Sequence, residues 1–200
     1  YMFFNCSKLT KIQIGLNSNS KTINMNSMFA YCNELTSLNL SGFSSIIVEN
    51  MESLFKNCSS LKVLDISNFI TNKVKNMKSM FESCIKLISL KFDIKKFDTS
   101  ETTNMEYMFT NCELLEILDV SYFNTKKVKN MEYMFSGCKK LNQLNLSNFE
   151  TSSVTNMRNM FELCVKLISL DVSSFNTYQV TNMQNMFSNC QLIPFLDISN

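Results

Sequence analysis

Apolar and polar residues alternate along this chain with two periods, which succeed each other in every stretch of about 26 residues. In residues 154–164 the apolar positions follow steps of three, three, one and three residues, at Val154, Met157, Met160, Phe161 and Cys164. Apolar residues at this spacing form one stripe of an α-helix. The pattern therefore predicts a short helix, with Asn156 placed to accept its first free amide hydrogens.

The residues that follow have the period of a β-strand. After Leu167, the apolar residues Leu170 and Val172 alternate with polar ones. This alternation predicts a short strand with one face buried and the other exposed to solvent. The exposed positions are Ser169, Asp171 and Ser173. Phe175 then closes the turn, and we expect it to stack with its counterparts in an aromatic spine: Phe43, Phe69, Phe97, Phe123 and Phe149.

The helix and strand patterns recur with one cysteine in each repeat. The spacing of the cysteines is constant from Cys6 to Cys84 and again from Cys112 to Cys190, and the step between Cys84 and Cys112 is longer by two. A strand, a loop and a short helix in about 26 residues fit the length of a leucine-rich repeat. We therefore predict an α/β repeat fold, a right-handed leucine-rich-repeat solenoid of about eight rungs. A parallel β-sheet would form one face and short helices the other.

The array occupies residues 1–200 as a single domain, with no linker and no second domain. We expect the chain to be a segment of a longer array, because neither end has the polar capping repeat that a solenoid needs.

Four repeated columns have structural interpretations. We expect the cysteines to be buried free thiols, with disulfides and a metal role as the alternatives. The methionines at helical spacing, such as Met157 and Met160, are predicted to fill the core. The asparagine column that includes Asn156 is predicted to bond backbone groups in its own and the adjacent rung. The threonine column that includes Thr177 is predicted to do the same.

The outward face of the strands is the predicted binding surface, because solenoids present such a face to partners. We select two columns of this face as candidate binding residues. One contributes Val63 and Ile117, and the other contributes Asp65, Lys91, Asp119, Asn145, Asp171 and Asp197.

The repeat with the extra two residues is the second candidate. Lys91 replaces the usual aspartate or asparagine there, and four more charged residues follow in the strand exit and loop: Asp93, Lys95, Lys96 and Asp98. Insertions in repeat proteins fall on loops of one face, often the binding face. A surface irregularity without function is the alternative for this rung.

Composition excludes several functions. The chain has no histidine, so no Ser/His or Cys/His nucleophile and no HExxH zinc site can form. Its three glycines are isolated, which excludes glycine-rich phosphate loops. The formal net charge is +2 without a basic run, which argues against nucleic acid as a partner. No apolar run is long enough to cross a bilayer. We predict no enzyme activity, no cofactor, no metal and no membrane insertion by this segment.

One complete unit reads VTNMRNMFELCVKLISLDVSSFNT over residues 154–177, and about nine of its columns recur along the chain. The unit resembles the 26-residue repeat of the BspA-like branch of leucine-rich repeats. That branch occurs in bacterial surface proteins, in mycoplasma surface lipoproteins and in protists. The resemblance covers essentially the whole chain. It implies a leucine-rich-repeat fold and a location on the cell surface or outside the cell, with an intracellular location left open.

The resemblance also implies a class of function, because members of that branch are associated with adhesion and protein binding. We predict a non-enzymatic binding module that contacts a protein or glycan partner through the exposed sheet face. The alternative is a structural spacer or scaffold in a larger surface or intracellular assembly. Self-association, end to end or side by side, is a further expectation.

Overall fold

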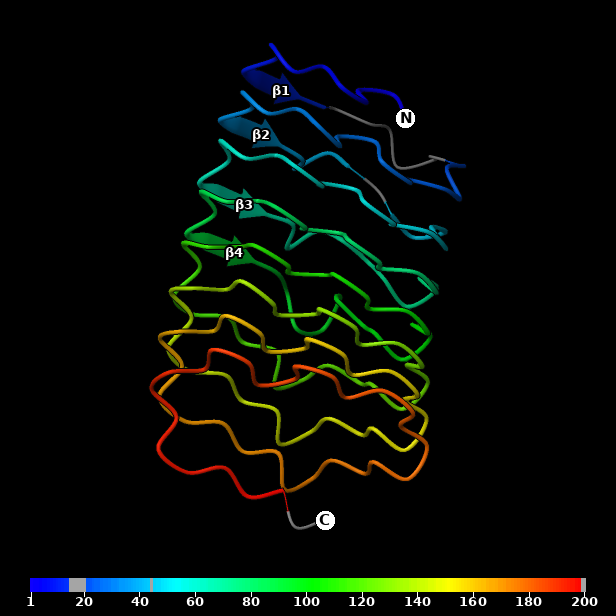
Figure 1. Cartoon of the computed structure of the whole chain (residues 1–200). Helices are drawn as coiled ribbons and strands as arrows, with labels where there is room; N and C mark the ends of the chain where they lie inside the picture. Colours follow the sequence, from blue (N-terminus) through cyan, green and yellow to red (C-terminus); the bar gives the residue numbers. More distant parts are fainter. Residues whose placement is uncertain (15–20, 44, 199–200) are drawn as a thin grey trace.

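The computed structural model describes residues 1–14, 21–43 and 45–198, and it is a stack of rungs that runs from the N-terminus to the C-terminus (Figure 1). Four strands of three residues each lie above one another along one side of the stack: β1 (Lys11–Gln13), β2 (Ser37–Asn39), β3 (Val63–Asp65) and β4 (Ser89–Lys91). β1 pairs with β2, and β3 with β4, both in parallel. The predicted parallel strands are therefore confirmed for the first four rungs. The strand predicted around Leu170 and Val172 does not form, and in the described later rungs the sheet side has one isolated parallel bridge, between Ile117 and Gln143.

The predicted short helices are wrong, since the part of the chain that the structure describes contains none. Consecutive β-turns replace them. In the rung that was predicted to be helical, the amide of Met160 donates to the carbonyl of Met157 at 3.2 Å, and the amide of Cys164 donates to the carbonyl of Phe161 at 3.2 Å. Turns of about four residues point a side chain inward at nearly the same interval as a helix does, so the apolar pattern is alike for both.

Backbone geometry and hydrogen bonding explain why no helix forms. Asn159 and Leu163 have φ angles of 56° and 60°. Such left-handed residues suit the third position of a type II turn but interrupt a right-handed helix. The amides of Phe161 and Leu163 donate to Met186 and Ser188 of the next rung, at 2.9 and 2.8 Å. Alternate amides of this segment therefore bind the neighbouring rung instead of their own.

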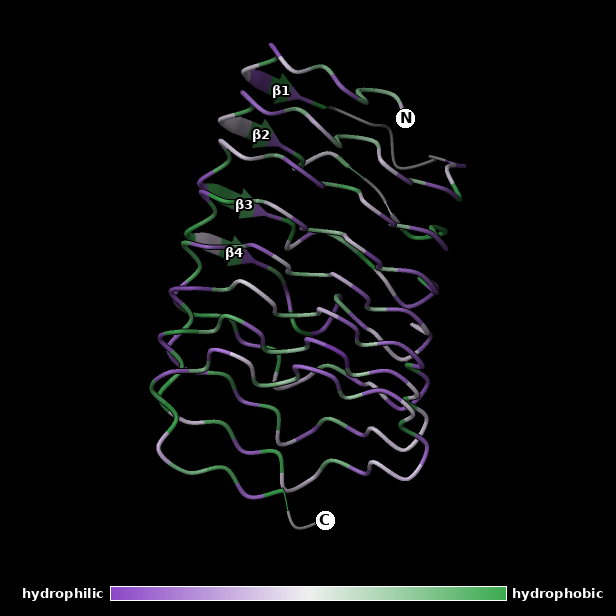
Figure 2. Ribbon diagram, viewed as in Figure 1, coloured by the Kyte–Doolittle hydropathy of each residue, from purple (hydrophilic) through white to green (hydrophobic). Residues whose placement is uncertain are grey.

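The core is built from columns that continue from rung to rung. Hydrophobic and hydrophilic stretches alternate along the rungs (Figure 2), and the predicted core residues Met157, Met160 and Cys164 are fully buried. One column stacks its rings without interruption, with centroids 5.3–5.7 Å apart and ring planes within 11° of parallel. Its members are Phe3, Phe29, Phe55, Phe81, Phe109, Phe135, Phe161 and Phe187.

The spine predicted around Phe175 is confirmed only in part. All its members are buried. Its rings stack between Phe43 and Phe69, at 5.5 Å, and between Phe97 and Phe123, at 5.8 Å. The continuous aromatic ladder is instead formed by the phenylalanine that stands three residues before each cysteine.

The cysteine column has the structural role that was predicted. The cysteines are free, and each thiol from Cys32 onward donates to a phenylalanine carbonyl of the preceding rung at 3.1–3.2 Å. Burial raises the pKa of the thiols of Cys84 and Cys138 to about 12. These thiols therefore stay protonated and can act as donors at neutral pH.

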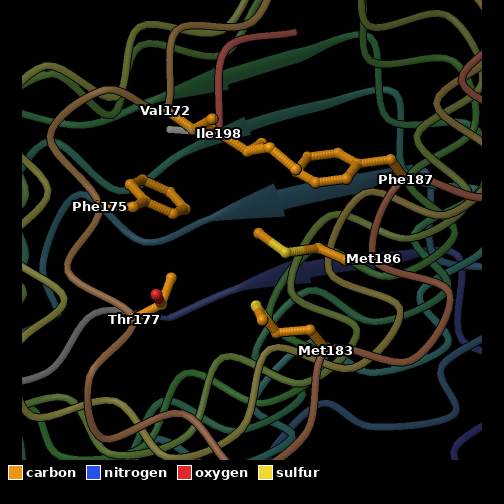
Figure 3. Close-up of a pocket in the computed structure, with 7 residues that line it drawn as sticks. All are labelled: Val172, Phe175, Thr177, Met183, Met186, Phe187 and Ile198. Carbon is orange, nitrogen blue, oxygen red and sulfur yellow. The ribbon is translucent and has the colours of Figure 1, made fainter. Parts of the chain in front are cut away.

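The core contains a cavity of about 260 Å³ in the last rungs (Figure 3). Val172 and Phe175, from the sheet side, face Met186 and Phe187 across it. All four belong to repeated core columns, so the cavity has no chemistry that differs from the rest of the core.

Candidate binding face

The outward side chains of the strands and of their counterparts in later rungs form an exposed surface, which we term the sheet face. Its two main columns are exposed at every position except Ser89, which is half-buried. The first column consists of Lys11, Ser37, Val63, Ser89, Ile117, Gln143, Ser169 and Phe195. The second consists of Gln13, Asn39, Asp65, Lys91, Asp119, Asn145, Asp171 and Asp197. All eight predicted sheet-face residues therefore lie where they could meet a partner.

The first column carries apolar side chains that are largely open to solvent. Ile117 and Phe195 are each 77% exposed, and Val63 is 54% exposed. Serine or glutamine occupies the same column in other rungs, so the fold does not require an apolar residue there. This column varies most in character from one rung to the next.

The aspartates and asparagines of the second column have a structural role that the sequence analysis missed. One side-chain oxygen of Asp65, Asp119, Asn145 and Asp171 accepts a hydrogen bond from the backbone amide two residues later, at 2.9–3.0 Å. This is the geometry of an Asx turn. Hydrogen bonds from Ser67 and Ser173 lower the pKa of the Asp65 and Asp171 carboxyls. One oxygen of each residue is thus committed to the turn that ends the strand.

In the irregular rung, several charged side chains bond to other residues of the same loop. The Oδ1 atom of Asp93 accepts a hydrogen bond from the amide of Lys95 at 2.9 Å, and its Oδ2 atom lies 3.6 Å from the Nζ atom of Lys96. Asp98 accepts the amide of Ser100 at 2.8 Å through its side chain. The inserted residues therefore form a closed loop, from which Lys91 and Lys95 are exposed.

An aromatic cluster lies beneath this loop. Phe92 stacks on Phe97 at 5.1 Å and meets the edge of Tyr122 at 5.6 Å. Burial raises the pKa of Tyr122, whose buried hydroxyl has no hydrogen-bond partner among the residues that the structure describes. The rings of Phe92, Phe97 and Tyr122 fill the space that the longer loop encloses.

We term the opposite side of each rung, which consists of the consecutive turns, the turn side. Its side chains join neighbouring rungs through stacked rings, cation–π contacts and ion pairs. Tyr107 and Tyr133 stack at 4.9 Å, with Lys78 5.8 Å from the first ring and Arg158 5.7 Å from the second. Lys78 also pairs with Glu106 at 3.0 Å. The opposite charges in this column, such as Lys78 and Glu106, could have indicated these pairs from the sequence.

The threonine column bonds the backbone of the adjacent rung as predicted, and the prediction for the asparagine column is confirmed in part, because Asn156 bonds the backbone of its own rung but a side chain of the preceding one. The Oδ1 atom of Asn156 accepts the amide of Arg158 at 3.1 Å, and its Nδ2 atom donates to Glu132 of the preceding rung at 2.9 Å. The hydroxyl of Thr125 donates to the carbonyl of Glu150 at 2.9 Å and accepts the amide of the same residue at 2.8 Å. Asn156 forms an Asx turn, not the helix cap that was expected.

The sheet face is hollowed where neighbouring strands lack a backbone ladder. β2 and β3 are not paired, and a hollow of about 350 Å³ there is lined by Asn39, Asp65 and Asn68. In the described later rungs, the amide of Ile168 donates to the carbonyl of Asn142 at 3.3 Å, and no backbone hydrogen bond joins residues 143–145 to residues 169–171. A hollow of about 440 Å³ crosses those rungs, and Gln143, Asn145, Ile168, Ser169, Asp171 and Phe195 line it.

Within the described ranges, no group of three or more acidic or cysteine side chains is placed to hold a metal ion. The same ranges contain no α-helix with the length and hydropathy that crossing a bilayer requires.

Parallel strands, a buried phenylalanine ladder and a period of about 26 residues define a protein of the leucine-rich-repeat type. The chain belongs to the family described as "Mycoplasma protein of unknown function, DUF285", whose model matches residues 1–113 and 85–194. This agrees with the BspA-like resemblance of the repeat unit. No curated protein matches the chain.

Solved leucine-rich repeat proteins share the fold. One from Bacteroides ovatus superposes with a TM-score of 0.58 at 19% identity, over 96% of this chain and 49% of that one. One from Eubacterium ventriosum superposes with a TM-score of 0.55 at 14% identity, over 93% of this chain and 48% of that one. The chain therefore spans about half the length of these two proteins.

A leucine rich cell surface protein from Faecalibacterium prausnitzii is also similar, at 15% identity, over 96% of this chain and 67% of that one. Its TM-score is 0.40, and so loose a superposition has no bearing on location or function.

Proposed function

We propose that the chain is a non-enzymatic binding module whose sheet face contacts a partner on or outside the cell. The observation that carries the proposal is the exposure of Ile117, Phe195 and Val63 in a column where the fold accepts serine equally well. These side chains are available to a partner, and solenoids typically present this face as an extended binding surface. The partner would be a protein or a glycan.

The contrast with the turn side supports this choice of face. On the turn side, ion pairs and stacked rings join neighbouring rungs, as Lys78, Glu106 and Tyr107 do. A partner that docked there would have to break contacts that hold the array together. The sheet face offers its first column without that cost. A spacer role, in which the sheet face has no contacts, is the competing proposal.

Substitutions taken from the repeat itself test the proposal without disturbing the fold. Ile117→Ser and Val63→Ser introduce the residue that the same column has at Ser37, Ser89 and Ser169. Leu163→Asn is the matched control on the turn side, because Asn57 and Asn111 occupy that column with the same positive φ. Leu163 is itself an exposed apolar residue, at 37%.

The measurement is binding of each purified variant to a panel of immobilised extracellular matrix proteins, mucin and neutral glycans. We expect the double sheet-face variant to lose at least about tenfold in affinity for whatever the parent protein binds, and Leu163→Asn to bind as the parent does. Equal binding by all variants, or a loss confined to Leu163→Asn, would support a spacer that makes contacts through its turn side.

A further inference from the structure

The hollow that crosses the later rungs combines apolar and polar side chains. Its apolar residues include Phe195 and Ile168, which are 77% and 50% exposed. Gln143, Asn145 and Asp171 add two amides and a carboxylate. The hollow has a volume of about 440 Å³ and is open along the sheet face.

The polar groups of the hollow keep bonding capacity after their structural bonds are made. The Oδ1 atoms of Asn145 and Asp171 accept the amides of Ser147 and Ser173, at 3.0 and 2.9 Å. These bonds fix both side chains, and they do not use the Nδ2 atom of Asn145. The hydroxyl of Ser173 also donates to the Asp171 carboxylate, whose two oxygens can accept further hydrogen bonds. The hollow thus presents a fixed amide donor and a fixed carboxylate acceptor from neighbouring rungs.

The charge of the hollow restricts the ligand. Asp171 is the one charged residue that lines it, and no lining residue in the described part of the chain is basic. Phosphate, sulfate and carboxylate ligands are commonly held by arginine or lysine, and here Asp171 would repel them without a compensating cation, so anionic ligands are unfavourable. Hydroxyl groups, by contrast, can donate to Asp171 and accept from an amide.

We propose that this hollow binds a neutral carbohydrate, an inference that rests on the sheet face being the contact surface. A pyranose has an apolar face of C–H groups and a rim of hydroxyls. The ring of Phe195 would pack against the C–H face, while Asp171, Asn145 and Gln143 bond the rim. An exposed aromatic ring together with a carboxylate and two amides suits such a ring, which has both an apolar face and hydroxyl groups.

The test is saturation-transfer NMR and calorimetric titration of the folded chain with named probes. The neutral probes are maltotriose, cellotriose, chitotriose and mannotriose. The anionic probes are sialyllactose and a heparin tetrasaccharide. We expect a neutral probe to bind and neither anionic probe to compete with it.

Variants locate the site. Phe195→Ala and Gln143→Ala should each weaken the neutral sugar at least about tenfold. Leu163→Asn is the matched control, since Leu163 is an exposed apolar residue of the turn side and lies outside the hollow. It should leave the affinity unchanged.

Three outcomes would overturn the inference: no neutral probe binds, an anionic probe binds in preference, or Phe195→Ala and Gln143→Ala bind as the parent does. An uncharged peptide that occupies the hollow and is not displaced by sugar would also overturn it. If the sugars fail while Ile117→Ser and Val63→Ser still abolish binding to a protein, the carbohydrate site falls and the wider proposal for the sheet face stands.

Discussion

On the turn side of each rung, backbone amides, side-chain amides and charged groups reach across to the neighbouring rung. On the sheet side, β1 pairs with β2 and β3 with β4, and later rungs are joined by fewer bonds, such as the bridge between Ile117 and Gln143 and the amide of Ile168 donating to Asn142 at 3.3 Å; hollows open between some of these rungs. The two sides of the molecule therefore have different roles. The turn side and the core provide most of the contacts between rungs, and the first column of the sheet face carries side chains that the fold does not use.

High pH is expected to destabilise the core most strongly. Burial raises the pKa of the Cys84 and Cys138 thiols from 9.0 to about 12. Because the folded state holds these protons longer than the unfolded chain does, their contribution to stability is complete below about pH 9 and is lost as the pH rises towards 12. Each thiol adds a slope of up to about 1.4 kcal/mol per pH unit in that interval.

Urea unfolding measured from pH 8 to pH 11 checks this prediction. Cys84→Ala with Cys138→Ala is the comparison, and the slope of unfolding free energy against pH should be shallower in this double variant. An identical slope would contradict the prediction and would show that these two thiols do not contribute to the loss of stability.

Truncation in the aromatic ladder is expected to have the next largest effect. Phe135 is fully buried and stacks on Phe109 and Phe161, both at 5.7 Å. Phe135→Ala should lower the free energy of unfolding by about 3–5 kcal/mol, through lost burial and the cavity that remains. Phe195→Ala on the sheet face should change it by less than about 0.5 kcal/mol. Comparable losses in the two variants would contradict the division between core and sheet face.

The smallest expected change in stability distinguishes the surface of the turn side from the sheet face. Tyr107→Ser introduces the residue found at Ser53 and Ser79 of the same column, and it removes the stack on Tyr133. We expect a loss of about 0.5–1.5 kcal/mol. Ile117→Ser makes the equivalent exchange on the sheet face and should leave the melting temperature unchanged. A larger loss from Ile117→Ser would mean that the sheet face also stabilises the array.

The repeat period, the inward columns and the fastening role of Asn156 and Thr125 could be predicted from the sequence, because each follows from which side chains recur. The secondary structure of the turn side could not. Its amides donate to a neighbouring rung, a full repeat away in the chain, and apolar spacing does not distinguish such turns from a helix. Residues such as Leu163, at a φ of 60°, give no sign of left-handed geometry in their side chains.

From the sequence, the candidate site could be predicted as the exposed face of the sheet, but not as a particular hollow within that face. The prediction that Asp65 and Asp171 lie on the surface is correct. Their Asx turns with the backbone amides of Ser67 and Ser173 were not predicted, although the sequence has a serine two residues after each aspartate. The hollow around Phe195 depends on where neighbouring strands separate, which no single repeat encodes. The Phe135 ladder was not predicted, because its residues were assigned to a helical stripe, which does not by itself require rings of neighbouring rungs to stack.

Amide hydrogen exchange, resolved residue by residue, tests the division between the two sides most directly. The amides of Tyr107, Phe109 and Asn111 donate to the next rung at 2.8–2.9 Å, and they should exchange only with unfolding of the array. The amides of Asn145 and Asp171 on the sheet side should exchange close to their intrinsic rates. Equal protection on the two sides, or stronger protection on the sheet side, would contradict the account.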